Sequence, residues 1–104
     1  MAGNIQATGM VWFKRENFER LIALFKDGHK LHRTYDEWFN AAEVGRKAFE
    51  AKGGRVVCVD IDPHDFPVWC KAKGHDLDAN GRQAYAAFIA YKTLTGVEPP
   101  DSVQ

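Results

Sequence analysis

The sequence predicts an α+β fold with a two-stranded sheet and four helices, in the order strand, helix, helix, strand, helix, helix. Two short runs of β-branched and aromatic residues are typical of strands. Four other segments repeat apolar residues every three or four positions and end near a glycine, which is typical of amphipathic helices. Of the 104 residues, 45% are apolar and 12% are aromatic, enough for one compact core. We therefore expect a single domain over residues 1–96 and a flexible tail over residues 97–104.

The first strand is predicted over residues 9–14, where the sequence reads Gly-Met-Val-Trp-Phe-Lys. Side chains alternate along a strand, so Met10 and Trp12 point to one face, and Val11 and Phe13 point to the other. Both faces are apolar. This strand therefore needs cover on both sides, either from the last helix or from a second copy of the chain.

The first two helices are predicted on either side of a loop over residues 28–34. The earlier one begins near Arg15 and places Phe18, Leu21 and Phe25 on one apolar stripe.

The second helix begins at a capping box, in which the Thr34 hydroxyl accepts a hydrogen bond from the backbone N–H of Glu37. Trp38 and Ala42 mark its core face, and a glycine pair at residues 53–54 ends it.

The second strand is predicted over residues 55–61, an apolar run that lies between this glycine pair and Asp62. Start and stop residues then place the last two helices. The third runs from near Asp65 to Lys73 and ends at Gly74, and the fourth runs from Ala79 to about Thr95 with Asp78 as its cap and Gly96 as its stop.

We expect the two strands to run antiparallel. Two helices that pack as an antiparallel hairpin would return the chain to the end where the first strand finished. A sheet of two strands is small, and edge-to-edge pairing of two copies would extend it to four strands in a dimer.

The charges balance over the whole chain but not along it. The 14 basic and 14 acidic residues give a net charge of zero, which disfavours strong non-specific binding of nucleic acid. Residues 14–55 carry ten basic and seven acidic side chains, and residues 56–104 carry four basic and seven acidic ones. Two copies in an antiparallel dimer could attract each other through these opposite halves.

Two cysteines, Cys58 and Cys70, lack the CxxC spacing of redox or zinc motifs, so we expect reduced thiols. No run approaches the roughly 18 apolar residues of a membrane-spanning helix, and the first ten residues do not resemble a signal peptide. We expect a cytoplasmic protein that does not bind membranes.

An apolar run at residues 56–62 delivers two carboxylates, Asp60 and Asp62, at its carboxyl end. It resembles the opening of haloacid dehalogenase-type phosphohydrolases, and the resemblance implies a nucleophilic Asp60, an acid/base Asp62 and a bound Mg²⁺. The resemblance covers only these seven residues, and the next two depart from that family's pattern. With His64 and Asp65 the carboxylates form a cluster of possible ligands without the spacing of a known metal motif. A small metal-dependent hydrolase is our third hypothesis.

A basic loop supplies the second hypothesis. It contains Lys26, His29, Lys30, His32 and Arg33, which would suit an anionic ligand or nucleic acid. The two histidines have an HxxH spacing, but no cysteine or carboxylate is fixed beside them, so we expect no metal there.

The leading hypothesis is a small, non-catalytic module for protein interaction or regulation. Its partner is a second copy of the chain, in a homodimer, or another protein that docks on the surface around the first strand. Trp12, Phe13 and Trp38 are the predicted partner-binding residues, because aromatic side chains dominate the energetics of interfaces. We expect no catalytic residues, no cofactor and no metal, because none of these motifs forms a complete catalytic or metal-binding set.

Overall fold

The computed structural model of the chain describes residues 6–99. The predicted α+β class is confirmed, with two strands and four α-helices, and two short 3₁₀ helices flank the first α-helix. Residues 100–104 of the predicted tail lie outside the described residues. The elements are β1 (Ala7–Trp12), η1 (Arg15–Asn17), α1 (Phe18–Leu24), η2 (Gly28–Lys30), α2 (Tyr35–Ala51), β2 (Arg55–Asp60), α3 (Asp65–Lys73) and α4 (Ala79–Thr95).

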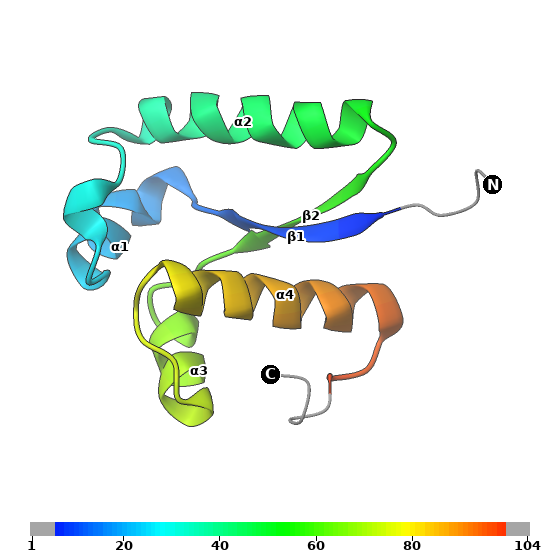
Figure 1. Cartoon of the computed structure of the whole chain (residues 1–104). Helices are drawn as coiled ribbons and strands as arrows, with labels where there is room; N and C mark the ends of the chain where they lie inside the picture. The colour runs from blue at the N-terminus through cyan, green and yellow to red at the C-terminus, as the bar shows by residue number, and fades with distance from the viewer. Residues whose placement is uncertain (1–5, 100–104) are drawn as a thin grey trace.

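The sheet forms the middle of three layers, with α2 on one side and α4 on the other (Figure 1). The short helices α1 and α3 lie toward the end of the sheet at which both strands finish. The layers formed by α2 and α4 cover the two faces of the sheet (Figure 1). The two edges of the sheet pair with no further strand within residues 6–99.

The two strands are parallel, so the antiparallel prediction is wrong. The unequal lengths of the two connecting helices explain the error. α1 has 7 residues and α2 has 17, which correspond to about 10 Å and about 25 Å of helix axis. The longer helix carries the chain back past the start of the shorter one and along the sheet. β2 consequently begins beside the first residue of β1, where Arg55 pairs with Ala7.

The face of β1 that carries Met10 and Trp12 packs against α2. The ring centroid of Trp12 lies 5.1 Å from that of Trp38 and 5.9 Å from that of Phe39. A Cβ placed on Gly45 would make an ordinary contact with Met10 Cε at 3.6 Å. This side of the first strand is thus covered within the chain.

The opposite face of β1 lies against α4, and Gly9 makes the close approach possible. A Cβ at this position would collide with the carbonyl oxygen of Ala86 and with the side chain of Ala90. Both alanines are buried, with exposed fractions of 0% and 5%. The last helix therefore supplies the cover that the sequence required on this side.

An aromatic cluster fills the space beyond the end of β1. The ring centroid of Phe13 lies 4.7 Å from that of Trp38 and 5.8 Å from that of Phe25, which in turn lies 5.9 Å from Phe66. All four side chains are buried. Burial of each such ring contributes roughly 1.5–3 kcal/mol, so the cluster ties α1, α2 and α3 to one end of the sheet.

The later helices begin and end where the sequence places them. The Thr34 hydroxyl accepts from the N–H of Glu37 at 3.1 Å, and the Asp78 carboxylate accepts from a backbone N–H of the first turn of α4 at 3.0 Å. Gly74 and Gly96 follow α3 and α4 with φ of 77° and 79°, in the left-handed region that glycine adopts without a steric cost.

The first helix is shorter than predicted. The segment that begins at Arg15 is divided into η1 and α1, and α1 ends at Leu24. The next helical bond would run from the N–H of Lys26 to the carbonyl of Ile22, but this N–H donates instead to the carbonyl of Leu77 at 2.8 Å. The chain thus leaves the helix to join the segment before α4, and the predicted loop contains η2.

Candidate functional site

The register of the sheet determines which backbone groups face outward. The N–H of Arg55 donates to the carbonyl of Gln6 at 2.7 Å, and the N–H of Ile61 donates to the carbonyl of Trp12 at 2.9 Å. Backbone groups alternate in direction along a strand. The outward-facing residues are therefore Val56, Cys58 and Asp60 on β2, and Ala7, Gly9 and Val11 on β1.

The edge of β2 is the more open of the two edges. Its middle residue, Cys58, is exposed, whereas Gly9 and Val11 in the middle of the other edge are half-buried beneath α4. The four residues between Arg55 and Asp60 carry no charge. No third strand pairs with either edge within residues 6–99, so the outward groups of β2 have no strand partner there.

Charges of opposite sign flank this edge. Lys52 and Arg55 lie at its start, and Asp60 and Asp62 lie at its end. Arg55 is exposed and forms no ion pair in the described part of the chain. The β2 edge therefore has a basic end, an apolar middle and an acidic end.

Asp60 lies at the carboxyl end of β2, beside the end of β1. Its Oδ2 is 3.7 Å from the Nζ of Lys14, and its Oδ1 is buried without a hydrogen-bond partner among residues 6–99. Burial raises the pKa of this carboxyl group, the charge of Lys14 opposes that shift, and the charge of Asp62 adds to it. Sequence reasoning selected Asp60 but gave no sign of the Lys14 contact, which the parallel pairing creates.

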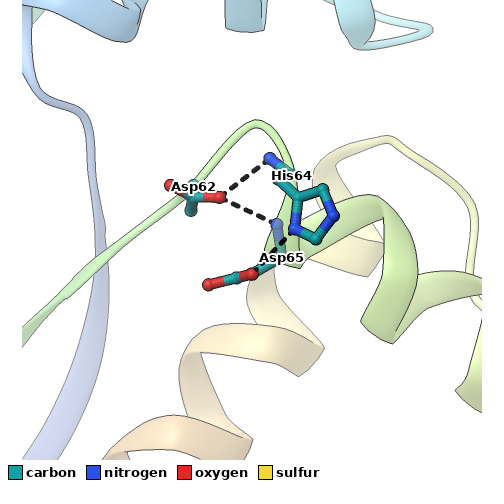
Figure 2. A group of neighbouring side chains, drawn as sticks. All are labelled: Asp62, His64 and Asp65. Carbon is teal, nitrogen blue, oxygen red and sulfur yellow. Dashed lines mark hydrogen bonds and ion pairs between the residues drawn. The ribbon is translucent and has the colours of Figure 1, made fainter.

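Asp62 lies with His64 and Asp65 in the turn that opens α3, and Figure 2 shows the three side chains around this turn. One ligand atom from each lies within 4.8 Å of the others. Asp62 Oδ2 accepts from the backbone N–H groups of His64 and Asp65, both at 2.8 Å, and these bonds lower the pKa of Asp62. His64 Nδ1 is 3.1 Å from Asp65 Oδ1. The arrangement is that of a helix cap, and Asp60 is not a member of the group.

The predicted aromatic anchors lie mainly inside the protein. Phe13 and Trp38 are buried, at 2% and 8% exposed, and pack against each other. Trp12 is half-buried and contacts Trp38 from the sheet. Of these three residues, Trp12 is therefore the one that is partly exposed.

In the described part of the chain, one residue of the predicted basic loop forms an ion pair, and the others do not. Lys26 Nζ lies 3.2 Å from a carboxylate oxygen of Asp76. The other four residues are exposed and form no ion pair within residues 6–99. They are His29, Lys30, His32 and Arg33.

The two cysteines lie in different surroundings, as free thiols. Cys70 is buried against α4, and burial raises the pKa of its thiol to about 11. Burial also raises the pKa of Cys58, although this residue is exposed by area and Arg46 opposes the shift. Neither thiol has the lowered pKa of a catalytic nucleophile.

Sequence reasoning missed one buried ion pair. The guanidinium of Arg82 donates to both carboxylate oxygens of Asp27 at 2.8 Å and lies 4.4 Å from the centroid of the Phe25 ring. Arg82 is 6% exposed. Its position three residues before Tyr85, on the buried side of α4, was the available signal, because an arginine there requires a buried partner.

A shallow groove of about 430 Å³ lies between α3 and α4. Trp69 lines it and stacks on His75 at 5.1 Å between ring centroids, while its Nε1 is buried without a hydrogen-bond partner in the part of the chain that the structure describes. Lys73 lies over the ring of Phe88 at 5.5 Å. Cations and carboxylates both line this groove, so it has no clear charge preference.

No helix within residues 6–99 has the length and hydropathy to cross a bilayer. Comparison of the chain with protein-family models, curated proteins and solved structures gave no match.

Proposed function

We propose that the protein is a non-catalytic interaction module that self-associates through an open strand edge. The observation that best supports this proposal is the uncharged middle of β2, where Cys58 is exposed and the outward backbone groups have no strand partner within residues 6–99. Such an edge readily pairs with another strand, and proteins that avoid this protect their edges with charges, proline or bulges. β2 carries none of these between Arg55 and Asp60.

The predicted aromatic residues keep a part in this proposal. Phe13 and Trp38 hold the sheet to α2 from within. Trp12 is half-buried and packs its ring against Trp38 and Phe39 of α2. In this arrangement the aromatic cluster supports the interface, and the strand edge makes the contact.

Light scattering coupled to size-exclusion chromatography tests the proposal directly. We expect a mass that rises with concentration toward about twice the 11.7 kDa of one chain. The mass of a single chain at every concentration up to the solubility limit would contradict self-association.

The exposed basic side chains after α1 support a second candidate function, the binding of an anionic ligand or nucleic acid. His29, Lys30, His32 and Arg33 lie close together in sequence and form no ion pair within residues 6–99. Binding of a fluorescent oligonucleotide, followed by anisotropy, should weaken steeply with added salt, since each neutralised phosphate releases counterions. No binding at low salt, or binding that salt leaves unchanged, would exclude this function.

A further inference from the structure

Building on the self-association proposed above, we propose that two copies pair antiparallel through β2, about a twofold axis at Cys58. The product is a four-stranded sheet in the order β1-β2-β2-β1. The outward residues Val56, Cys58 and Asp60 would then lie opposite Asp60, Cys58 and Val56 of the second copy. Three such pairs exchange about six backbone hydrogen bonds.

This register follows from the alternation of the backbone. Only outward-facing residues can oppose one another in hydrogen-bonded pairs, so the twofold axis must pass through Val57 or Cys58 to overlap most of the strand. An axis at Val57 would place Asp60 opposite Gly54, which lies outside the strand. An axis at Cys58 matches all three outward residues with one another.

The charges at the two ends of β2 favour an antiparallel second copy. In this register Arg55 lies opposite Ile61 of the second copy. Side chains alternate along a strand, so Arg55 and Asp60 of the second copy lie on opposite faces of the sheet and form no direct ion pair. The basic start of each strand is nevertheless next to the acidic end of the other, which is a weak long-range attraction. Parallel pairing of the same edges would bring like charges together, which costs free energy.

The edge of β1 is less suited to this contact. α4 approaches so closely at Gly9 that a Cβ would collide with it, and the middle of this edge is half-buried. At β2 the middle residue, Cys58, is exposed.

The first experiment compares the dimer dissociation constants of full-length variants by light scattering. Cys58→Lys places a charge at the centre of the edge and should weaken dimerisation by about tenfold or more. Arg55→Glu reverses one of the flanking charges and should weaken dimerisation by about two- to fivefold, because no direct ion pair is lost. Cys58→Ser and Arg33→Glu are the matched controls. Arg33→Glu makes the same charge change on an exposed arginine far from β2 in the sequence, and both controls should dimerise like the wild type.

The second experiment traps the pair as a disulfide. Opposed Cα atoms in a hydrogen-bonded pair lie about 5.5 Å apart, within the disulfide range of roughly 4.4–6.8 Å. Mild oxidation with copper phenanthroline and oxygen, which removes two electrons and two protons from the thiol pair, should give a covalent dimer on a non-reducing gel. Cys70→Ala should retain this product, and Cys58→Ser should lose it, because the buried Cys70 does not react. Val44→Cys in the Cys58→Ser background moves the thiol to another exposed site. This variant should form the covalent dimer far more slowly than the wild type.

The outcomes separate the two proposals. Weakened dimers in Cys58→Lys and Arg55→Glu, with trapping at Cys58, support the β2 pairing. A wild-type dimer that persists in both variants and is not trapped at Cys58 uses another surface, which overturns the β2 pairing and leaves self-association intact. A wild-type monomer overturns both. Far-UV circular dichroism confirms the fold of each variant, and Arg55→Glu, at an exposed strand end, tests the pairing even if Cys58→Lys does not fold.

Discussion

Arg82 illustrates at the level of single residues how one charge can be placed inside a small core. Its guanidinium takes both oxygens of Asp27 and lies over the Phe25 ring, so its charge is balanced and its planar face is packed. The pair joins Asp27, which follows α1, to Arg82 of α4, and these two residues are 55 positions apart in sequence. This contact, together with the bond from Lys26 to Leu77, fixes where the first helix must end.

Asp27→Asn should destabilise the protein by about 3 kcal/mol at pH 7, because it leaves the buried Arg82 without its counter-charge. The hydrogen bonds from Arg82 hold the pKa of Asp27 below its ordinary value of 3.8, despite the opposing effect of burial. The contribution of the pair is therefore complete above the unfolded pKa and is lost as the pH falls through the lower, folded value.

Urea unfolding of wild type and Asp27→Asn at pH 7 and near pH 2 measures this dependence. The difference between them should be full at pH 7 and should shrink as the pH falls toward the lowered pKa of Asp27, where the wild-type carboxyl group begins to take up a proton. Asp36→Asn is the control, since Asp36 forms an exposed pair with Arg15 whose loss should cost less than about 1 kcal/mol. Equal losses in the two variants at pH 7 would contradict the buried role of Asp27.

Asp62→Ala separates a capping role from a metal-binding role. As a cap that accepts from two backbone N–H groups, Asp62 should contribute about 1 kcal/mol to stability. Thermal unfolding should show this loss equally with and without Mg²⁺ or Mn²⁺. A wild-type melting temperature that rises with either ion, and a variant that does not respond, would instead support the hydrolase hypothesis.

At the level of secondary-structure elements, glycines set how closely the helices approach the sheet. Gly9→Ala should destabilise the protein by about 1–3 kcal/mol, because its Cβ would collide with the backbone of α4 at Ala86. Gly45→Ala should instead stabilise the protein. Among residues 6–99 its Cβ meets only Met10 Cε at 3.6 Å, and alanine favours the helix by up to about 1 kcal/mol over glycine.

Chemical denaturation of the two glycine variants provides the comparison, with wild type as the reference. Stabilisation by Gly9→Ala would mean that α4 is free to move away from β1. Clear destabilisation by Gly45→Ala would mean that α2 lies closer to the sheet than the described contacts allow.

Local signals predicted most element boundaries but not how the elements meet. The Thr34 cap, the Asp78 cap and the glycines after α3 and α4 act within a few residues of sequence, so the sequence alone was enough to find them. The end of α1 depends on the bond from Lys26 to Leu77, a partner 51 residues away. No local pattern could reveal that competition.

For the whole molecule, the direction of the second strand was the main error. Composition and periodicity indicated an α+β class, but strand direction depends on where α2 ends in space. The same holds for the candidate site, where the sequence predicted residue types but not their direction or burial. Sequence reasoning selected Asp60 and Asp62 by type, while the outward direction of Cys58 and the burial of Phe13 and Trp38 follow from register and packing.

The parallel pairing of β1 with β2 also affects how the chain can fold. Ala7 pairs with Arg55 and Trp12 with Asp60, so each pair joins residues 48 positions apart (55 − 7 and 60 − 12). Contacts this distant in sequence require a long loop to close first, which slows folding. During synthesis, β1 leaves the ribosome before α1, α2 and β2 have been made, so its partner strand β2 is not yet available. Until then its apolar residues depend on α1 and α2, or on chaperones, for protection from aggregation.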